Sequence, residues 1–339
     1  MKLALKIIEK KLRIVYWALP GILILTLISC APKLTAVSTT RIALGTYIKI
    51  TIVVDHGRAS IAQDAIEKAY TMIESYEKIF DYRVEDGALA IFNDKTVLEE
   101  GDEKVLLSLI KEALQYANLT NGYFDPTILP LVKLWGFNSK SPRLPSPEEI
   151  TRTLQFVGYE NTLTSVDGVK KPEWLKFDLS GIAKGKIVDL IRDSLKEQGY
   201  KNFLIDAGGD IYVSGLNSRR KKWRIAIQDP EHRERFSGVV EKTDTAIVTS
   251  GDYENYFEEG GRLYSHLLDP HTGYPNSDCK SVTILASDTG FADAIATGVF
   301  VMGSQRGSKF LIENKVEGFI IYKTVDGKIK TYSTSGFWK

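Results

Sequence analysis

Residues 281–298, SVTILASDTGFADAIATG, contain the strand-to-helix step on which the rest of this fold depends. The β-rich run over 281–286 predicts a strand, and the apolar spacing over 291–302 predicts a helix. In that helix Asp293 and Thr297 lie four residues apart and therefore share one face. Two hard oxygen ligands on one face are suited to part of a Mg²⁺ shell. A structural alternative stays open, because Asp favours a first helical turn and Thr often bonds to its own backbone.

A second segment, FDLSGIAKG at 177–185, predicts a strand end that leads through a glycine-containing turn into a helix ending near Gly199. The N-terminus of a helix offers backbone N–H groups to an anion, and Lys184 adds a mobile positive charge. The segment therefore predicts phosphate binding. It has neither the residue order of a P-loop nor the glycine spacing of a dinucleotide-binding turn.

The third segment is centred on one of only four histidines, His266, in YSHLLDPHTGYP at 264–275. It follows TSGDY at 249–253 and precedes a turn rich in Asp, Pro and Gly, where a scaffold can present side chains to a ligand. Histidine in such a place is a candidate proton acceptor. The alternative is an imidazole that only bonds to a turn carbonyl.

Four further segments complete a series: LGT at 44–46, YRVEDGALAIFN at 82–93, GYFDPT at 122–127 running on to LWGF at 134–137, and DAGGDI at 206–211. In their order along the chain, these seven segments resemble the ApbE family of FAD:protein FMN transferases. The resemblance extends from about Arg41 to the C-terminus. It implies an α+β fold of mixed sheets with flanking helices and a central FAD cleft.

The resemblance also implies the roles of individual residues. Mg²⁺ would be bound by the backbone carbonyl of Gly181 and the side chains of Asp293 and Thr297. FAD would be contacted by Leu44, Tyr82, Tyr123, Phe124, Asp125, Asp178, Lys184 and Leu268. The residue types agree with these roles, because aromatic rings can stack on flat heterocycles and carboxylates can accept from ring or ribose donors. Taken singly, Tyr82 and Phe124 are better explained by core packing.

The chain departs from the family pattern at three places. Leu44 stands where the family usually has Met, an exchange of similar volume that should keep an apolar contact. The segment 82–93 lacks a Ser that is common there and has one residue more than the family pattern. Ala296 stands where some relatives have an acidic residue. The metal site is therefore expected to have one carboxylate, with water or FAD phosphate oxygens completing the octahedron.

The N-terminus predicts export and lipidation. Basic residues up to Arg13 precede an apolar run over 14–29, and LISC at 27–30 resembles a bacterial lipobox, so Cys30 is the expected lipid acceptor. The alternative is a signal anchor that remains as a transmembrane helix, but the run is shorter than about 20 residues and Pro20 interrupts it. We expect a signal peptide over 1–29, a lipidated tether over 30–40, and an extracytoplasmic, membrane-attached protein.

Composition excludes several classes of protein. Cys30 and Cys279 are the only cysteines, so acylation of Cys30 leaves no disulfide framework. The net charge of +1 and hydrophobic content of 43% indicate neither a nucleic-acid-binding footprint nor disorder. The one basic cluster, 219–222, lies between two predicted strands. We interpret it as a solvated hairpin tip, with anionic lipid or a protein partner as the alternatives.

The remaining pattern predicts one large domain over 41–339, with a division into two intimate subdomains as the alternative. Helices are expected over 59–80, 103–118, 126–135 and from 147, where Ser146 is a good N-cap. A strand is expected over 42–54. Further strands are expected over 203–205, 211–213, 223–227, 245–248, 318–322 and 328–332. The site should lie where the Gly181 turn, the His266 strand and the Asp293 helix converge.

The resemblance implies an enzyme that transfers FMN from FAD to a Ser or Thr hydroxyl of a partner protein and releases AMP, and His266 is the candidate that accepts the hydroxyl proton. The expected partners are flavin-bearing subunits of membrane redox complexes or exported reductases. A tethered enzyme and tethered acceptor would meet at raised effective concentration. Two alternatives remain: an FAD pyrophosphatase that forms FMN and AMP, and a flavin-binding lipoprotein without chemistry. Asp293, Thr297 and His266 disfavour the second, because simple binding needs neither a metal nor a base.

Overall fold

The computed structural model describes residues 34–339 apart from 100, 102, 138, 140, 233, 254, 276 and 277. The predicted signal peptide and the predicted lipidation of Cys30 lie outside the described residues. Within the described part of the chain, no helix combines the length and the apolar character needed to cross a membrane.

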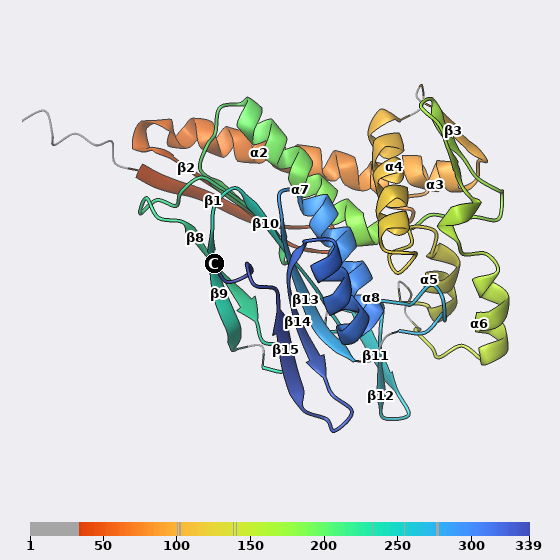
Figure 1. The fold of residues 1–339 in the computed structure, drawn as a ribbon. Coiled ribbons are helices and arrows are strands. Elements are labelled where there is room, and N and C mark those ends of the chain that lie inside the picture. The colour runs from red at the N-terminus through yellow and green to blue at the C-terminus, as the bar shows by residue number, and fades with distance from the viewer. Residues whose placement is uncertain are drawn as a thin grey trace, which may run out of the picture.

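An antiparallel sheet of eight strands forms the centre of the molecule, in the order β1-β2-β6-β7-β10-β13-β14-β15 (Figure 1). These strands are β1 (Leu34–Ala43), β2 (Thr46–Asp55), β6 (Phe203–Ala207), β7 (Asp210–Ser214), β10 (Thr245–Gly251), β13 (Cys279–Ala286), β14 (Glu317–Lys323) and β15 (Ile329–Ser333). The predicted α+β class is confirmed. The expected mixed pairing is corrected, because every described strand pair is antiparallel.

The connection from β13 to β14 explains why even that pair is antiparallel. The intervening helix α8 (Thr289–Glu313) is broken at Gly303, whose φ of 79° and ψ of 172° are accessible essentially only to glycine. The two legs then pack on each other, since a Cβ at Gly307 would lie 2.9 Å from a methyl of Val299. The second leg therefore returns the chain to the end of the sheet where the first leg began.

Three helices cover one face of the sheet: α2 (Ala59–Phe80), α7 (Ser180–Glu197) and α8 (Figure 1). The bounds of α2 agree with the prediction, because its apolar stripe is continuous. Helix α7 ends just before Gly199, which adopts the expected left-handed conformation with φ of 83°. These helices and the sheet enclose the main core, which includes Ile50, Ile66 and Ile191.

The other face of the sheet is covered by a hairpin of β8 (Trp223–Gln228) and β9 (Phe236–Lys242). Ile227 and Val240 of the hairpin pack with Ile247 of the sheet and with Phe337 near the C-terminus, which forms a second, smaller core. The sheet is thus buried on both faces over its central strands.

A second group of elements lies beside the end of the sheet (Figure 1). It comprises α3 (Ala88–Asn93), α4 (Lys104–Leu119), α5 (Leu129–Trp135), α6 (Pro147–Leu154), the short strands β3 (Val97–Glu99), β4 (Leu163–Thr164) and β5 (Gly168–Lys170), and the hairpin of β11 (Tyr256–Glu259) and β12 (Arg262–Ser265). Trp135 is fully buried here, and its indole N–H donates to Gly273 O at 2.9 Å. This bond ties the polar turn after His266 to α5. The predicted cap of α6 is confirmed as a capping box of Ser146 and Glu149.

Two local predictions are corrected. The tether predicted over 30–40 overlaps β1, which pairs with β2 from Leu34 onward, so the strand predicted over 42–54 is the second half of a hairpin that begins earlier. None of the side chains of β1 is fully buried and half of them are exposed, as expected of an edge strand, so the sequence has no buried stripe to mark it.

The basic cluster over 219–222 is not a hairpin tip. It lies in the connection from β7 to β8, and these strands belong to different sheets. Helix α3 and strands β9 and β11 were not predicted, because each is short or has little hydrophobic periodicity.

Candidate functional site

A cleft lies between the start of α7, the segment after β12 and the first leg of α8, as expected. Its lining includes every residue predicted for it: Leu44, Tyr82, Tyr123, Phe124, Asp125, Asp178, Gly181, Lys184, His266, Leu268, Asp293 and Thr297. Segments distant in sequence therefore meet in one cavity, as a binding site requires.

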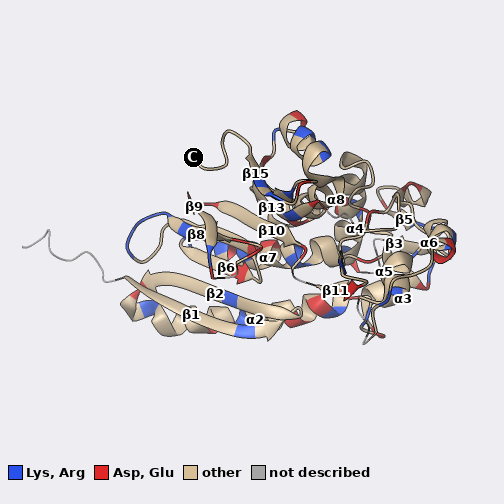
Figure 2. Cartoon of the chain, turned by 90° about the horizontal axis from the view of Figure 1, so that it is seen from below, with Lys and Arg blue, Asp and Glu red and all other residues tan. Residues whose placement is uncertain are grey.

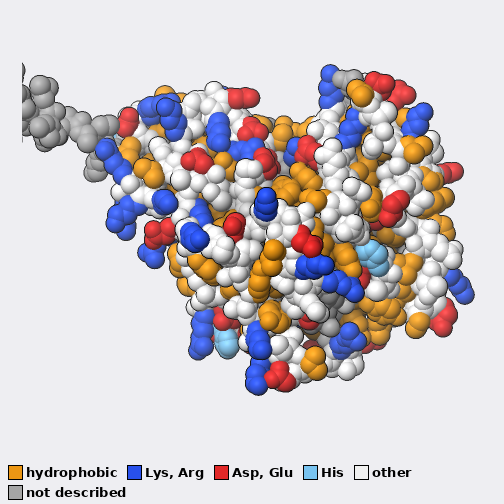
Figure 3. All heavy atoms as spheres, in the orientation of Figure 1, with side chains coloured by type: hydrophobic (Ala, Val, Ile, Leu, Met, Phe, Trp, Pro, Cys, Tyr) orange, Lys and Arg blue, Asp and Glu red, His pale blue; other side chains and the backbone are white. Residues whose placement is uncertain are grey.

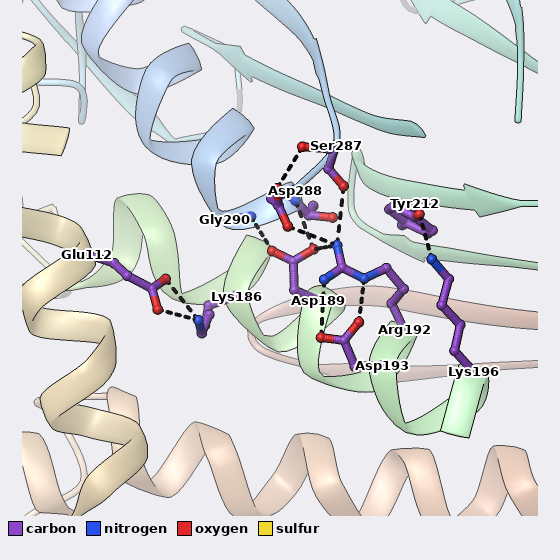
Figure 4. Close-up of polar contacts among 11 residues, drawn as sticks. Glu112, Lys186, Asp189, Arg192, Asp193, Lys196, Tyr212, Ser287, Asp288 and Gly290 are labelled. Carbon is purple, nitrogen blue, oxygen red and sulfur yellow. Dashed lines mark hydrogen bonds and ion pairs between the residues drawn. The ribbon is translucent and has the colours of Figure 1, made fainter. Parts of the chain in front are cut away.

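The start of α8 is fixed by a side chain of α7. The Asp189 carboxylate accepts from the backbone N–H groups of Thr289 and Gly290, both at 2.8 Å, and from Arg192 at 2.7 Å (Figure 4). Backbone N–H groups in a first helical turn have no partner within the helix, so Asp189 acts as a cap supplied from a neighbouring helix. The cap sets the position of Asp293 one turn further on.

Close contact between α7 and α8 continues at Gly185. Its backbone N–H donates to Asp293 Oδ2 at 3.0 Å. A Cβ added at Gly185 would lie 2.5 Å from Thr289 O and 2.9 Å from Asp293 Cβ, closer than real side chains approach. Glycine is therefore required for the two helices to approach this closely.

Asp293 is one of two buried carboxylates that share the positive charge of Lys184. Asp210 is 1% exposed, and Lys184 Nζ lies 3.2 Å from its Oδ1. Burial raises the pKa of Asp293 well above its usual range, and the neighbouring charge of Asp210 raises it further. Burial also raises the pKa of Asp210, against the opposing effect of Lys184. Asp210, Asp293 and Lys184, which we call the cleft floor, thus place two carboxyls beside one lysine, and the raised pKa values mean that a proton or a cation between the carboxyls is favoured.

Thr297 lies near both the α7 turn and β10. Its Oγ1 is 3.5 Å from Ser250 Oγ, and a Cβ at Gly181 would lie 3.5 Å from the same Oγ1. The backbone of the Gly181 turn, the Thr297 hydroxyl and the Asp293 carboxylate are thereby gathered on one side of the cleft.

These oxygens form a donor set of the type that a hard divalent cation prefers. The Oδ2 of Asp210 is buried and has no hydrogen-bond partner among the described residues, which is costly unless a ligand satisfies it. The described side chains contain no group of three or more His, Cys, Asp or Glu residues placed to hold a metal. A shell here would therefore depend on carbonyl, hydroxyl and ligand oxygens.

His266 is held as a neutral ring. Its Nδ1 lies 3.0 Å from Asn255 O, and the same carbonyl accepts from the His266 backbone N–H, also at 3.0 Å. Because a carbonyl can only accept, Nδ1 bears the proton and Nε2 is the accepting nitrogen. Burial lowers the pKa of His266, and the charge of Lys184 lowers it further. The ring is therefore hydrogen-bonded to a backbone carbonyl, which was the non-catalytic alternative for this histidine. The bond uses Nδ1 and leaves Nε2 able to accept a proton.

The part of the cleft lined by Leu44, Tyr82 and Tyr123 is apolar and aromatic. Leu44 lies at the β1–β2 turn with φ of 53°, a left-handed conformation that is unusual for a large non-glycine residue. Tyr123 packs against His271, with ring centroids 4.6 Å apart, and its hydroxyl accepts from Arg306 at 2.5 Å. Lys133 Nζ lies 5.8 Å from the centroid of the Tyr82 ring. The two tyrosines offer flat surfaces for a heterocycle.

The two remaining predicted carboxylates differ in how they are bonded. Asp125 accepts from Thr127 N–H at 2.8 Å, from the Thr127 hydroxyl at 2.7 Å and from Tyr159 N–H at 3.1 Å, so it organises its own loop. Asp178 accepts from Ser180 N–H at 2.9 Å through Oδ1, while its Oδ2 is buried without a partner among the described residues. Burial raises the pKa of both. Asp178 is therefore the better placed of the two to bond to a ligand.

Asp210 lines the cleft but was not among the predicted site residues, although it lies in the DAGGDI segment at 206–211. The available signal was the glycine pair before it. Gly208 and Gly209 form the tight β6–β7 turn with φ of 61° and 100°, and a Cβ at Gly208 would lie 2.3 Å from Thr46 Oγ1. Other lining residues that were missed include Glu77, Asp81, Arg83, Ile128, Val132, Phe137 and Ile187.

Comparison with known proteins agrees with this geometry. The family model described as "ApbE family" matches residues 44–320. A Vibrio cholerae protein named FAD:protein FMN transferase is 36% identical, covering 95% of this chain and 97% of the relative. A Haemophilus influenzae protein of the same name is 29% identical over 93% of this chain and 94% of the relative.

Solved structures give the same result. The flavin transferase ApbE from Vibrio cholerae superimposes with a TM-score of 0.80 and 35% identity, covering 90% of this chain and 98% of that one. The apo form of a Pseudomonas stutzeri flavinyl transferase ApbE gives a TM-score of 0.81 and 28% identity, with 91% and 97% coverage. The chain belongs to the ApbE family.

Proposed function

We propose that this protein transfers FMN from FAD to a Ser or Thr hydroxyl of a partner protein. The acceptor oxygen attacks the phosphorus on the FMN side of the pyrophosphate, the bond to the bridging oxygen breaks, and AMP leaves with that oxygen. The hydroxyl loses its proton, and the partner keeps FMN through a phosphoester bond. The names of the relatives support FAD as the FMN donor and a protein as the acceptor.

The residues of the cleft have distinct parts in binding FAD. Tyr82, Tyr123 and Leu44 supply the flat and apolar surface for the ring system. The unpartnered Oδ2 of Asp178 can accept a hydrogen bond from a ring or ribose donor. Lys184 lies on the floor, where its charge can pair with the pyrophosphate once FAD is bound.

The floor also fits Mg²⁺, which Gly181 O, Asp293 and Thr297 would hold, with Asp210 beside them. Two buried carboxylates next to a single lysine, one with an orphaned oxygen, are the observation that supports this fit. When bound, the ion would neutralise charge on the pyrophosphate and the departing AMP.

His266 is the proposed proton acceptor. Its Nδ1 bond to Asn255 O orients the ring and leaves Nε2 to take the hydroxyl proton. The pKa of a catalytic base should lie near or below the working pH, and burial beside Lys184 keeps this ring neutral at pH 7. A binding protein has no use for such a base, so this group, on a charged floor, is the feature that favours catalysis over storage.

The proposal is tested by incubating the protein with FAD, Mg²⁺ and the soluble domain of a flavin-bearing redox subunit. Intact mass of the acceptor and free AMP are then measured in parallel. Transfer predicts an acceptor heavier by one FMN unit, an equal amount of AMP, and loss of both on chelation. Free FMN and AMP with an unchanged acceptor would instead show hydrolysis.

A pair of variants controls this experiment. Asp293→Asn removes the floor carboxylate and should eliminate both products. Asp326→Asn removes an exposed carboxylate in the β14–β15 turn and should leave both unchanged. AMP release with no transfer in every acceptor tried would overturn the transferase assignment.

We further propose that Cys30 is acylated and holds the protein on the outer side of the cytoplasmic membrane, near flavin-bearing subunits of redox complexes or exported reductases. The lipobox-like LISC at 27–30 supports this placement. Metabolic labelling with palmitate should mark the wild-type protein in the membrane fraction. Cys30→Ala should lose the label, and a labelled variant would contradict the assignment.

A further inference from the structure

The connection from β7 to β8 presents four consecutive cations, Arg219, Arg220, Lys221 and Lys222, all exposed. None of these side chains forms an ion pair with another described residue. Runs of lysine and arginine are often mobile and merely solvated, so the conformation of the loop and its place in the fold decide whether this one can act as a surface.

The loop is ordered by one side chain. Asn217 Oδ1 accepts from the N–H groups of Arg219 at 2.9 Å and Lys221 at 3.3 Å, and its Nδ2 donates to Lys222 O at 2.9 Å. Arg220 takes a left-handed conformation with φ of 59°. The four cations therefore project from a fixed turn, and little backbone entropy would be lost when they bind.

This loop lies at the end of the sheet where the described chain begins. Leu216 N–H donates to Asn202 Oδ1 at 2.7 Å, and Asn202 O accepts from Val53 N–H at 2.8 Å. Val53 lies close to Asp55, which pairs with Leu34 at the start of β1. Figure 2 shows the basic loop beside β8 at the same end as the start of β1.

We call this end of the molecule, formed by Arg58, Lys201 and residues 219–222, the basic end. Arg58 follows the end of β2, Lys201 precedes Asn202, and both are exposed. The acidic residues at this end include Asp55, Glu197 and Asp244, and Asp244 already accepts from Ser214 and Gly215. Blue side chains gather over this side of the surface in Figure 3. The basic end therefore has an excess of positive charge.

The cleft lies at the opposite end of the same strands. The Leu44–Gly45 and Gly208–Gly209 turns connect the cleft ends of β1–β2 and β6–β7. Strand β1 has 10 residues, and a rise of about 3.3 Å per residue separates its two ends by about 30 Å.

The basic end lies close to the predicted lipid-bearing residue, because β1 starts there at Leu34. The covalent chain from Cys30 to Leu34 can span at most about 14 Å when fully extended. If Cys30 is anchored as proposed, so short a connection keeps this end of the sheet at the membrane surface. The charge of the loop then matches the negative potential of a bilayer that contains anionic phospholipids.

We propose that the basic end docks on anionic phospholipid headgroups, so that β1 and β2 stand away from the bilayer and the cleft opens about 30 Å above it. This inference rests on the proposed anchoring, and it adds an orientation that anchoring alone does not provide. A flavin-accepting domain that projects from the membrane would meet the cleft at that height.

The test compares the acylated protein, purified from membranes and reconstituted through its N-terminal lipid, in two kinds of vesicle, pure phosphatidylcholine and phosphatidylcholine with phosphatidylglycerol. Amide hydrogen exchange is followed over 215–222. We expect slower exchange in the anionic vesicles, by severalfold or more, and reversal of the difference by high salt, because exposed charges are screened. Equal exchange in the two vesicle types would overturn the proposal.

Matched variants separate docking from general charge. A loop variant with Arg219→Gln, Arg220→Asn, Lys221→Gln and Lys222→Gln should exchange equally in both vesicles; Asn is chosen at 220 because it tolerates the left-handed conformation. A control variant with Lys170, Lys323, Lys328 and Lys330 each changed to Gln loses the same charge from other exposed positions and should keep the difference. Loss of the difference in the control as well would show a net-charge effect and overturn the proposal. The measurement uses neither FAD nor acceptor, so its outcome is independent of that of the transfer assay.

Discussion

Two buried carboxylates at the α7–α8 contact, Asp189 and Asp293, look alike in sequence but differ in their surroundings. Burial raises the pKa of both. Asp189 is compensated by two backbone N–H groups and by Arg192 (Figure 4). Asp293 receives one backbone N–H and stands beside a second carboxylate, Asp210.

We propose that the difference separates a residue that supports the fold from one that takes part in the chemistry. A buried charge whose partners are all supplied by the protein stabilises one arrangement of the chain. A buried charge placed beside a like charge destabilises the ligand-free protein, and such a site persists where a ligand relieves the repulsion. In this protein the first kind of site holds α8 in place, and the second kind lies one turn further along the same helix.

The sharpest test of this comparison is Asp293→Asn. The change keeps the shape of the side chain but removes one of two repelling charges, so FMN transfer should fall by about 10³-fold or more while the melting temperature stays equal or rises. Mg²⁺ should raise the melting temperature of the wild type and not that of the variant. Transfer rates and thermal unfolding with and without Mg²⁺ measure both effects. A stable variant that keeps full Mg²⁺-dependent transfer would show that the Asp293 carboxylate is not needed for metal binding or transfer.

His266→Gln extends the comparison to a third buried titratable group. Loss of a general base should lower transfer by about 10²- to 10⁴-fold with little change in FAD affinity. In the wild type the pKa of His266 in the folded protein lies below its usual value of 6.5. The transfer rate should therefore stay constant down to about pH 6.5 and decrease only at lower pH, where His266 becomes protonated. The variant should lack that decrease. An unchanged pH profile in an active variant would assign the proton to another acceptor.

The same shift has a consequence for stability. The unfolded chain binds the histidine proton more readily than the fold does, so the contribution of neutral His266 is fully present above about pH 6.5 and decreases as the pH falls through the folded pKa. Urea unfolding of wild type and His266→Gln between pH 5 and 8 should show the two stabilities diverging as the pH falls. Parallel curves would contradict a lowered pKa.

Asp189→Ala tests the structural side. It leaves two helix N–H groups unpartnered and Arg192 without its buried partner, so the free energy of unfolding should fall by about 3 kcal/mol. Asp189→Asn keeps one acceptor and should lose less. Below the melting temperature, the folded Asn variant should retain more transfer activity than Asp293→Asn at equal Mg²⁺. If Asp189→Ala were as stable as the wild type but inactive, Asp189 would be needed for the reaction and not for the stability of the fold.

The sequence could predict what local patterns determine. Helix α2 has a continuous apolar stripe, and its bounds were predicted to the residue. Strand β1 is not detectable in this way, because none of its side chains is fully buried and its half-buried positions include Thr as well as Val. The reversal of the chain at Gly303 was not predicted either, because a single glycine within a helical pattern is compatible with an uninterrupted helix.

For the cleft, residue chemistry alone indicated Asp293, Thr297, Lys184 and His266, and the family resemblance supplied the rest. All of them line one cavity. Asp210 and Asp189 were not assigned, because their significance lies in what they meet in space: a second carboxylate in one case and the start of a distant helix in the other. Such pairings depend on tertiary packing, which no local pattern encodes.

The smallest effect is expected from the contact between α4 and α7 in Figure 4, where Lys186 Nζ lies 2.6 Å from Glu112 Oε1. Both side chains are partly exposed, so water competes for the pair. Glu112→Gln should therefore cost about 0.5 kcal/mol of unfolding free energy and leave transfer unchanged. Chemical unfolding at low and high salt measures this, and the cost should shrink as salt rises. A loss as large as that of Asp189→Ala would mean that α7 is positioned from the α4 side, and capping of α8 would then be a consequence of that placement.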